Sequence, residues 1–261
     1  MKQILRTLHL DTVCEQAMCP NIGECFSAKV ATFLILGKNC TRNCSFCNVQ
    51  KAQPLPIDVD EPERVAQAVY QLGLNHVVIT GVTRDDIIDG GAGIFADTVN
   101  RIHRKMPKVT VELLIPDFGF SPDSLKTVVA AGPQIIAHNV ETVPSLYRYV
   151  RQGADYARSL VLLRQLKEIA PQLITKSGLM LGLGEKTEEI LTVMHDLRSA
   201  KCDLLSIGQY LAPSSKHYPV KDFISPAQFA DYKAKAKQLG FLHIESGPYV
   251  RSSYLAAEYL S

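Results

Sequence analysis

Apolar positions along the chain fall into six short continuous runs, and each run is followed by one or two segments with helical periodicity. The runs have the length and the flanking turn residues of buried strands, and in the later segments apolar residues recur every three or four positions. The runs predict strands at 31–37, 76–81, 109–115, 134–139, 174–183 and 203–210. The periodic segments predict helices at 60–73, 92–106, 122–131, 143–151, 155–170, 187–200 and 226–239, and a short strand is expected at 241–245.

The alternation of strands and helices predicts the fold class. A strand that is followed by a helix and then by another strand forms a parallel sheet with right-handed crossovers. Six such units fall short of the eight that close a full barrel. The expected fold is therefore α/β, a partial (β/α)6 TIM-like barrel at 31–240, with an N-terminal cysteine-bearing extension at 1–30 and a short C-terminal extension at 241–261.

The first long helix has clear end signals in the sequence. Asp60 stands at its start and Glu63 follows three residues later, which is the arrangement of a capping box. Gly73 is expected to end the helix, because glycine readily adopts the left-handed conformation of a C-cap.

Composition narrows the class of protein. The chain has 261 residues, 46% of them hydrophobic and 21% charged, which is typical of a globular enzyme. Its 28 basic and 26 acidic residues give a net charge of +2, too balanced for a nucleic-acid groove. No run reaches the roughly 18 apolar residues of a membrane span, and the polar N-terminus does not resemble a targeting segment. We therefore expect a cytosolic, cytoplasmic protein with no nucleic-acid or membrane partner.

Six of the seven cysteines lie between residues 14 and 47, in two groups of three. The first triplet has the spacing CxxxxCxxxxxC and the second has CxxxCxxC. The members of the first triplet are Cys14, Cys19 and Cys25, and those of the second are Cys40, Cys44 and Cys47. In a reducing cytosol such clusters are metal ligands or redox groups more often than disulfides. Cys202 stands alone and is predicted to be a buried small hydrophobic residue.

The number three limits what each triplet can bind. A structural zinc site has four protein ligands, so one zinc site would leave two of the six cysteines unexplained. A four-iron cluster held by three thiolates keeps one iron open for another ligand. The second triplet directly follows the first predicted strand, at the end where parallel α/β folds build their sites. A zinc-stabilised interaction protein and a two-cluster electron carrier remain as alternatives.

The second triplet resembles the motif of the radical S-adenosylmethionine (SAM) superfamily, in which this spacing is the hallmark. The resemblance implies that the open iron binds SAM and that one electron cleaves its sulfonium, which yields a radical that abstracts hydrogen from the substrate. The cysteines would then be catalytic as well as metal-binding. The aromatic residue before the last cysteine, Phe46, would lie near the adenine in this superfamily, and a core aromatic is the alternative interpretation.

Six further motifs extend the resemblance to the lipoyl synthase family over nearly the whole chain. They are RDDxxDGGA at 84–92, ExLIPDF at 112–118, HNxETVP at 138–144, KSGxMxGLGE at 176–185, GQYL at 208–211 and GPxxRSSY at 247–254. The first triplet, with Pro20 and Asn21 directly after Cys19, is similar to the auxiliary-cluster motif of that family. The resemblance implies two [4Fe-4S] clusters and SAM as a co-substrate.

The resemblance also assigns roles to individual residues. Ser253, the second serine of RSSY, would be the fourth ligand of the auxiliary cluster, which supplies sulfur; a Ser-Ser pair is otherwise typical of a turn. Polar residues are the candidates for holding SAM: Asn139 and Glu141 for the ribose or the amine, and Arg151 and Lys176 for the carboxylate. The Gly-rich stretch 178–185 would let the backbone approach the adenosyl part. The 84–91 loop either lines the substrate entrance or is a turn stabilised by aspartate caps.

The implied reaction inserts two sulfur atoms, at carbons 6 and 8, into an octanoyl chain on a lysine of a lipoyl carrier protein. The carrier would be a 2-oxoacid dehydrogenase acyltransferase subunit or a glycine-cleavage H protein. A low-potential electron donor and an iron-sulfur carrier are further implied partners. Arg148, Arg151 and Arg158 are a candidate docking surface for an acidic carrier domain, an assignment that competes with Arg151 as a SAM contact. The alternative enzyme is a sulfur-inserting enzyme of the biotin synthase type, and the first triplet and RSSY argue against it.

Overall fold

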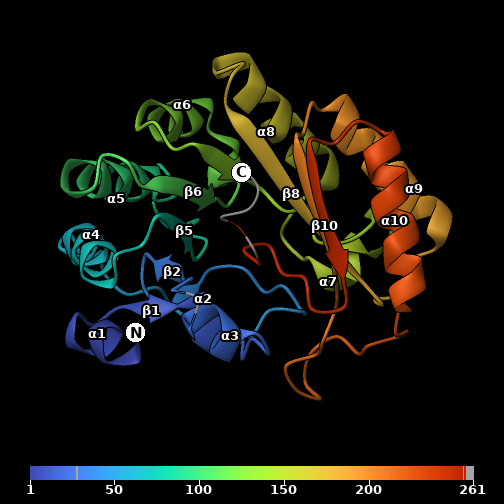
Figure 1. Cartoon of the computed structure of the whole chain (residues 1–261), viewed down its shortest axis with the longest axis horizontal. Coiled ribbons are helices and arrows are strands. Elements are labelled where there is room, and N and C mark those ends of the chain that lie inside the picture. The colour runs from blue at the N-terminus through green and yellow to red at the C-terminus, as the bar shows by residue number, and fades with distance from the viewer. Residues whose placement is uncertain (28, 255, 257–261) are drawn as a thin grey trace. The chain divides into compact units, whose positions relative to one another are not determined.

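The computed structural model describes residues 1–27, 29–254 and 256, which form an α/β fold with a mostly parallel sheet (Figure 1). All six predicted strands are present with slightly different ends, and each precedes a helix, so the predicted alternation is confirmed. The chain divides into two compact units. The first consists of Met1–Arg42 and Val49–Ile136, and the second of Asn43–Asn48 and Ala137–Ser261.

The first unit contains strands in the order β1-β2-β5-β6. β2 pairs in parallel with β5, and β5 with β6, whereas β1 is antiparallel to β2. Helices α4, α5 and α6 lie in a row beside these strands (Figure 1). The elements are α1 (Lys2–Thr7), β1 (Asp11–Thr12), α2 (Val13–Gln16), α3 (Ile22–Ser27), β2 (Thr32–Ile35), β3 (Asn39–Cys40), β4 (Gln50–Lys51), α4 (Glu61–Leu72), β5 (His76–Gly81), α5 (Ala92–Lys105), β6 (Thr110–Leu114), η1 (Phe118–Phe120), α6 (Pro122–Ala130) and β7 (Ile135–Ala137), which ends at the division between the units.

The second unit contains the parallel strands β8, β9 and β10, in that order. α10 packs against β10 (Figure 1). A large cluster of buried apolar side chains forms the core of this unit. The elements are η2 (Pro144–Leu146), α7 (Tyr147–Val150), α8 (Tyr156–Ile169), β8 (Ile174–Leu181), α9 (Thr187–Ser199), β9 (Leu204–Gln209), α10 (Pro226–Gln238) and β10 (His243–Gly247). Within the described residues, no helix has both the length and the apolar character that a membrane span requires.

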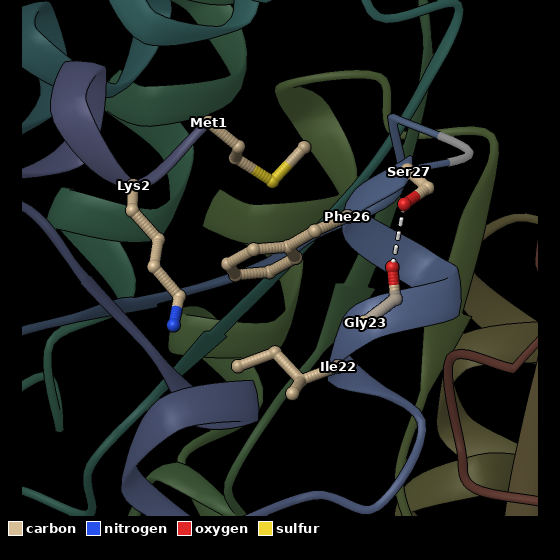
Figure 2. A pocket seen from close by; sticks show the side chains of 6 residues that line it. All are labelled: Met1, Lys2, Ile22, Gly23, Phe26 and Ser27. Atoms are coloured by element: carbon tan, nitrogen blue, oxygen red, sulfur yellow. Dashed lines mark hydrogen bonds between the residues drawn. The ribbon is translucent and has the colours of Figure 1, made fainter.

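Residues 1–30 contain more regular structure than their sequence pattern predicts. Three short helices and β1 are present, and Leu5 and Leu10 are buried. Elements of two to six residues are too short to show a hydrophobic period, which explains why the pattern misses them. A surface hollow of about 300 Å³ lies between α1 and α3, where Phe26 and Ile22 face Met1 (Figure 2).

The predicted capping box of α4 is wrong. Asp60 does occupy the N-cap, and Gly73 ends the helix with φ of +61°, but the Asp60 side chain makes no capping hydrogen bond. Glu63 instead forms ion pairs with Arg101 and Lys105 of α5. The neighbouring cations therefore draw the Glu63 carboxylate away from the helix start.

Cys202 lies between α9 and β9 and has no exposed surface, which confirms the prediction of a buried residue. Burial, aided by the nearby Asp203 carboxylate, raises the pKa of its thiol to about 12.

We therefore expect Cys202 to resist alkylation in the native protein. At pH 8 a thiol with this pKa is ionised in about one molecule in ten thousand, and burial also blocks the reagent. Mass spectrometry of peptides after iodoacetamide treatment measures the modification of each cysteine. Labelling of Cys202 without denaturant, at a rate similar to that of the other six thiols, would contradict this interpretation.

Candidate functional site

The three cysteines of the first triplet lie on two short consecutive helices and on the connection between them. Cys14 lies on α2, Cys25 lies on α3, and Cys19 lies on the turn between these helices. The amide of Cys19 donates to the carbonyl of Cys14 at 3.0 Å, which closes this turn. Thr12 caps α2 by accepting a hydrogen bond from the amide of Glu15 at 3.3 Å. The chain thus folds back on itself within twelve residues and brings the thiols near one another.

Cys14 and Cys19 lie close enough to Cys25 to influence its ionisation. Burial raises the pKa of Cys25 to about 11, and the negative charges of Cys14, Cys19 and Glu24 add to the effect. Burial also raises the pKa of Cys14, opposed by hydrogen bonding to Thr32 on β2 and supported by Cys19. All three thiols are free. Crowded thiols without a disulfide fit the ligand set of a metal cluster, whose positive charge would stabilise the thiolates.

The second triplet begins at the end of a small parallel β-bridge. Cys40 is the last residue of β3, which pairs with β4, so the loop 41–49 leaves and returns at one point. Cys40 belongs to the first unit, and Cys44 and Cys47 belong to the second. The amide of Cys47 donates to the carbonyl of Cys44 at 3.2 Å in a tight turn. Within the described residues, no three side chains of His, Cys, Asp or Glu are arranged to hold a single metal ion; a cluster differs, because each thiolate binds a different iron.

Ser45 fastens the loop segment Asn43–Asn48 within the second unit. Its hydroxyl donates to the carbonyl of Tyr149 at 2.6 Å, and its amide donates to that of Val150 at 3.0 Å. Phe46, the next residue, packs against a buried cluster that contains Val150, Leu183 and Tyr210. The structure therefore supports the interpretation of Phe46 as a core aromatic, and its place near an adenine stays a prediction.

Asn139 and Glu141 lie directly after β7, as the sequence predicts, and they contact each other. The Asn139 side-chain amide donates to Glu141 Oε1 at 3.1 Å and to Ser252 Oγ at 2.6 Å. Its Oδ1 is buried and has no hydrogen-bond partner in the described part of the chain. Glu141 adopts φ of +66°, a conformation that is unusual for a residue with a side chain, and its backbone bridges to Leu179 of β8. A strained acid beside an unsatisfied amide oxygen is typical of a binding site.

Arg151 follows α7 and lies close enough to Glu141 to influence its charge. Its Nη1 donates to Tyr147 Oη at 3.0 Å and to Ser159 Oγ at 3.2 Å. Burial raises the pKa of Glu141, and the positive charge of Arg151 opposes that effect. Burial works against the charge on Arg151 too, but Tyr147, Glu141 and Cys44 outweigh it and raise the pKa of Arg151. Arg151 is therefore held among Glu141, Tyr147 and Cys44.

Lys176 and the glycine-rich stretch 178–185 lie on β8 and in the loop that follows it. Lys176 is buried near the beginning of β8, and its role as a SAM contact stays a prediction. A Cβ atom at Gly178 would lie 2.7 Å from Asn139 Oδ1 and 3.0 Å from Ser252 Oγ. Gly182 has φ of +94°, and a Cβ atom there would overlap Gln209. A larger residue at either of these two positions would therefore collide with neighbouring groups of the chain itself.

Ser253 lies in a turn after β10, in which the amide of Tyr254 donates to the carbonyl of Arg251 at 2.9 Å. The preceding Ser252 is tied to Asn139, a contact that the sequence does not reveal. Ser253 belongs to the second unit and the first triplet to the first unit. The turn, which is the alternative interpretation of this serine pair, is present, and the ligand role of Ser253 stays a prediction.

Comparison with known families and structures agrees with these features. The family model of the radical SAM superfamily matches residues 34–197. Among solved structures, methylornithine synthase has a TM-score of 0.63 at 15% identity, over 93% of this chain and 74% of that one. Streptococcus suis SuiB bound to S-adenosylmethionine has a TM-score of 0.62 at 12% identity, over 84% of this chain and 50% of that one. These likenesses confirm the predicted partial-barrel fold class.

Curated relatives are similar over almost the full chain. The lipoyl synthase of Geobacter sulfurreducens is 61% identical over 259 residues, which cover 99% of this chain and 85% of the relative. That of Geobacter metallireducens is 60% identical, covering 99% of this chain and 91% of the relative. That of Caldanaerobacter subterraneus is 54% identical, covering 98% and 90%. The chain therefore belongs to the lipoyl synthase family of the radical SAM superfamily, whose members are sulfur-inserting enzymes that use SAM and a [4Fe-4S] cluster.

Proposed function

We propose that this chain inserts two sulfur atoms, at carbons 6 and 8, into an octanoyl chain carried on a lysine of a lipoyl carrier protein. The observation that carries the proposal is the crowding of Cys14, Cys19 and Cys25 within one unit, where burial and the neighbouring Cys14 and Cys19 disfavour ionisation of Cys25. A SAM-binding triplet alone would serve many radical reactions. A second set of three free thiols supplies the place for a sulfur donor.

Each group of ligands has a distinct task in this proposal. Cys40, Cys44 and Cys47 hold the cluster that binds SAM, and the first triplet holds the auxiliary cluster with Ser253 as fourth ligand. When bound, the two clusters supply the electron that cleaves SAM and the sulfur that is inserted. Serine oxygen is a harder ligand for iron than thiolate. Ser253 would therefore hold its iron less firmly than a cysteine, which would suit a cluster that supplies sulfur.

Four polar side chains are proposed to hold SAM. Asn139 offers a buried oxygen that has no partner among the described residues, suited to a donor such as a ribose hydroxyl or an amine. Glu141 offers a carboxylate with one hydrogen bond, and Arg151 keeps a positive charge for the SAM carboxylate. Lys176 is retained as a second cation, and Phe46 as the aromatic neighbour of the adenine. Arg151 is drawn inward by Tyr147 and Ser159, which favours this role over carrier docking.

The carrier domain is the proposed macromolecular partner, together with a low-potential electron donor and an iron-sulfur carrier. Arg148, exposed on α7, lies with its guanidinium 4.4 Å from the ring centre of the half-exposed Tyr149. Arg158, also exposed, lies near the start of α8. A basic and aromatic surface of this kind suits an acidic carrier domain, so the docking surface is narrowed to Arg148, Tyr149 and Arg158.

We expect the anaerobically reconstituted chain to hold about eight irons, in two four-iron clusters. With SAM, a reductant and an octanoyl-lysine peptide it should form 5′-deoxyadenosine and a sulfur-bearing peptide, both followed by mass spectrometry. Ser253→Ala should still cleave SAM but should lose sulfur insertion. Ser246→Ala on β10 is the control: it removes a hydrogen bond to the Phe229 carbonyl worth only about 1 kcal/mol, and sulfur insertion should persist.

Three outcomes would contradict this proposal. Zinc in place of iron would exclude the reaction. Deoxyadenosine without a sulfur-bearing peptide would favour a different substrate, as in an enzyme of the biotin synthase type. Wild-type product yield from Ser253→Ala would exclude Ser253 as a necessary ligand.

The raised pKa of Cys25 predicts how the iron-free protein reacts. Below a pKa of about 11 the thiolate fraction of Cys25 grows about tenfold for each pH unit, and only the thiolate is nucleophilic. Alkylation of Cys25 should therefore accelerate through pH 7, 8, 9 and 10, as measured by peptide mass spectrometry. After iron reconstitution Cys25 should be protected at every pH. A rate that levels off near pH 8 would contradict the crowding on which the pKa depends.

Charge reversal at the docking surface should weaken carrier binding. Arg148→Glu combined with Arg158→Glu places two negative charges where an acidic domain approaches, so its affinity should fall at low salt and the difference should shrink at high salt. Titration calorimetry with an octanoylated carrier domain measures this. Lys237→Glu on the exposed side of α10 is the control and should bind normally. Equal affinity of the double variant and the wild type would exclude this surface.

A further inference from the structure

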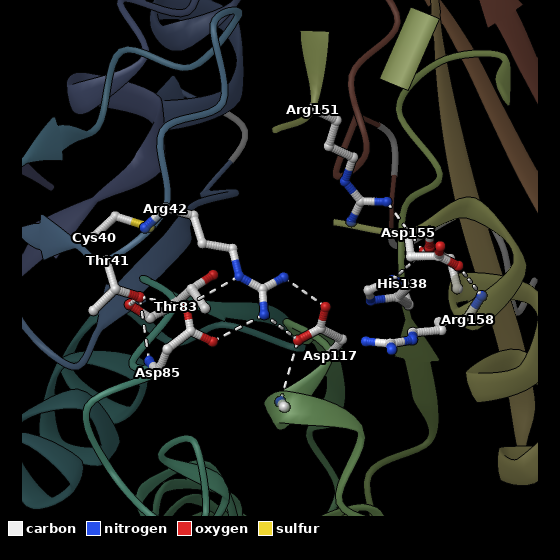
Figure 3. Close-up of polar contacts among 12 residues, drawn as sticks. Cys40, Thr41, Arg42, Thr83, Asp85, Asp117, His138, Arg151, Asp155 and Arg158 are labelled. Atoms are coloured by element: carbon white, nitrogen blue, oxygen red, sulfur yellow. Dashed lines mark hydrogen bonds and ion pairs between the residues drawn. The ribbon is translucent and has the colours of Figure 1, made fainter. Parts of the chain in front are cut away.

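The acidic loop 84–89 contacts an arginine that lies between the first and second cysteines of the SAM motif. Arg42 lies in the loop between Cys40 and Cys44, and its side chain is only 13% exposed. Its guanidinium contacts two carboxylates at once (Figure 3). Nη1 and Nη2 donate to the two oxygens of Asp117 at 2.5 and 2.6 Å, and Nε and Nη2 donate to the two oxygens of Asp85 at 3.1 and 2.9 Å.

The two carboxylates are themselves held in place by the first unit. Asp85 follows β5, and Asp117 follows β6 and is almost completely buried. Asp117 Oδ1 also accepts a hydrogen bond from the amide of Gly119 at 3.2 Å, which caps η1. Arg84, the neighbour of Asp85, donates to the carbonyl of Leu36 at 3.3 Å and so ties its loop to the end of β2. Arg42 therefore binds acceptors whose positions are fixed by three parallel strands.

Thr41 adds a second attachment beside the arginine. Its amide donates to the carbonyl of Thr83 at 3.1 Å, and its hydroxyl lies 2.8 Å from Asp85 Oδ2. The amide of Asp85 donates back to the Thr41 hydroxyl at 3.2 Å. The peptide between Thr41 and Arg42 is therefore fixed from both sides (Figure 3).

The attached segment also donates a hydrogen bond to a cysteine of the SAM motif. The backbone amide of Arg42 donates to Cys40 Sγ at 3.4 Å. Hydrogen bonds to the cysteine sulfurs of an iron-sulfur cluster stabilise its reduced state and tune its reduction potential. The direction of this amide depends on the Thr41–Arg42 peptide, which the Asp85 and Asp117 contacts hold.

We propose that Arg42 is a positioning residue: anchored on Asp85 and Asp117, it aims its backbone amide at Cys40 and thereby raises the reduction potential of the SAM-binding cluster. The inference rests on the proposed function only in that Cys40 ligates a reducible cluster. It gives the 84–89 loop a purpose that neither the substrate-entrance nor the simple turn interpretation provides.

Arg42 and the carboxylates that it contacts keep one another charged. Burial alone would lower the pKa of Arg42, but the carboxylates of Asp117 and Asp85 outweigh burial and raise it. Burial would raise the pKa of Asp85, and its hydrogen bonds from Arg42 and Thr41 lower it instead. Arg42 and Asp85 thus remain charged at neutral pH. A lysine would keep the charge but lose the planar fork that binds two carboxylates.

The test compares two changes in the network with a matched control. Arg42→Lys and Asp117→Asn each loosen the fork. Arg101→Lys is the control, because Arg101 also bridges two carboxylates, Asp97 and Glu63, and lies on α5 without a cysteine beside it. The holoenzyme is titrated with a reductant, and the readout is the electron paramagnetic resonance signal that changes when SAM is added.

For Arg42→Lys we expect the ratio of reduced to oxidised cluster to fall about tenfold at one set potential, which corresponds to about 59 mV for a one-electron couple. Asp117→Asn should shift the potential in the same direction, and Arg101→Lys should leave it unchanged. If Arg42→Lys and Asp117→Asn fold but lose the iron of this cluster while Arg101→Lys keeps it, the positioning role is also supported. Full iron content with unchanged potentials in both network variants would overturn the inference.

Failure of this inference is separable from failure of the proposed function. A wild-type chain that reduces its cluster and cleaves SAM, yet inserts no sulfur, would refute the function and leave the role of Arg42 testable by potential alone. Unchanged potentials together with normal sulfur insertion would refute the inference alone.

Discussion

Burial and the neighbouring thiols of Cys14 and Cys19 disfavour ionisation of Cys25, and this is the constraint on which the N-terminal segment depends. α2 and α3 have four and six residues, lengths at which a helix is unstable by itself. The pairing of β1 with β2 and the burial of Leu5 attach the segment to the sheet. These attachments leave Cys25 buried beside Cys14 and Cys19, so its ionisation remains disfavoured. Bound iron would replace the thiol protons, and its positive charge would stabilise the thiolates. Cluster binding and ordering of residues 11–27 are therefore expected to be coupled.

The second unit contains two neighbouring side chains, Asn139 and Glu141, in energetically unfavourable states. In the part of the chain that the structure describes, Asn139 Oδ1 is buried without a partner, and Glu141 is held in a left-handed conformation with a side-chain hydrogen bond from Asn139. Folding alone gains nothing from either feature, because an unsatisfied buried polar atom and a strained backbone both destabilise the protein. The backbone bridge between Glu141 and Leu179 maintains the arrangement. A ligand that donates hydrogen bonds to both side chains would offset that cost, which is why the pair is a better candidate for binding SAM than Lys176.

The sequence predicted what depends on period and spacing and missed what depends on contacts between distant residues. The six strands, the helices after them and the two triplets are visible as local patterns. The Asp60–Glu63 capping box failed because α5 supplies cations that no local pattern reveals. The bond between Asn139 and Ser252 joins residues 113 positions apart, and that between Arg42 and Asp117 joins residues 75 apart. A motif shows that such residues matter, whereas only the fold shows which of them meet.

The parallel sheet of the first unit explains why the Arg42 network forms. Parallel strands present their carboxyl ends at one edge, so the residues that follow β2, β5 and β6 meet there. Leu36, Asp85 and Asp117 occupy those three positions, and each accepts hydrogen bonds from an arginine side chain of this edge. Two acidic side chains at one edge would repel each other without a cation between them. Arg42 removes that repulsion, and because it lies two residues after Cys40, the same ion pairs that stabilise the edge also fix the start of the SAM motif.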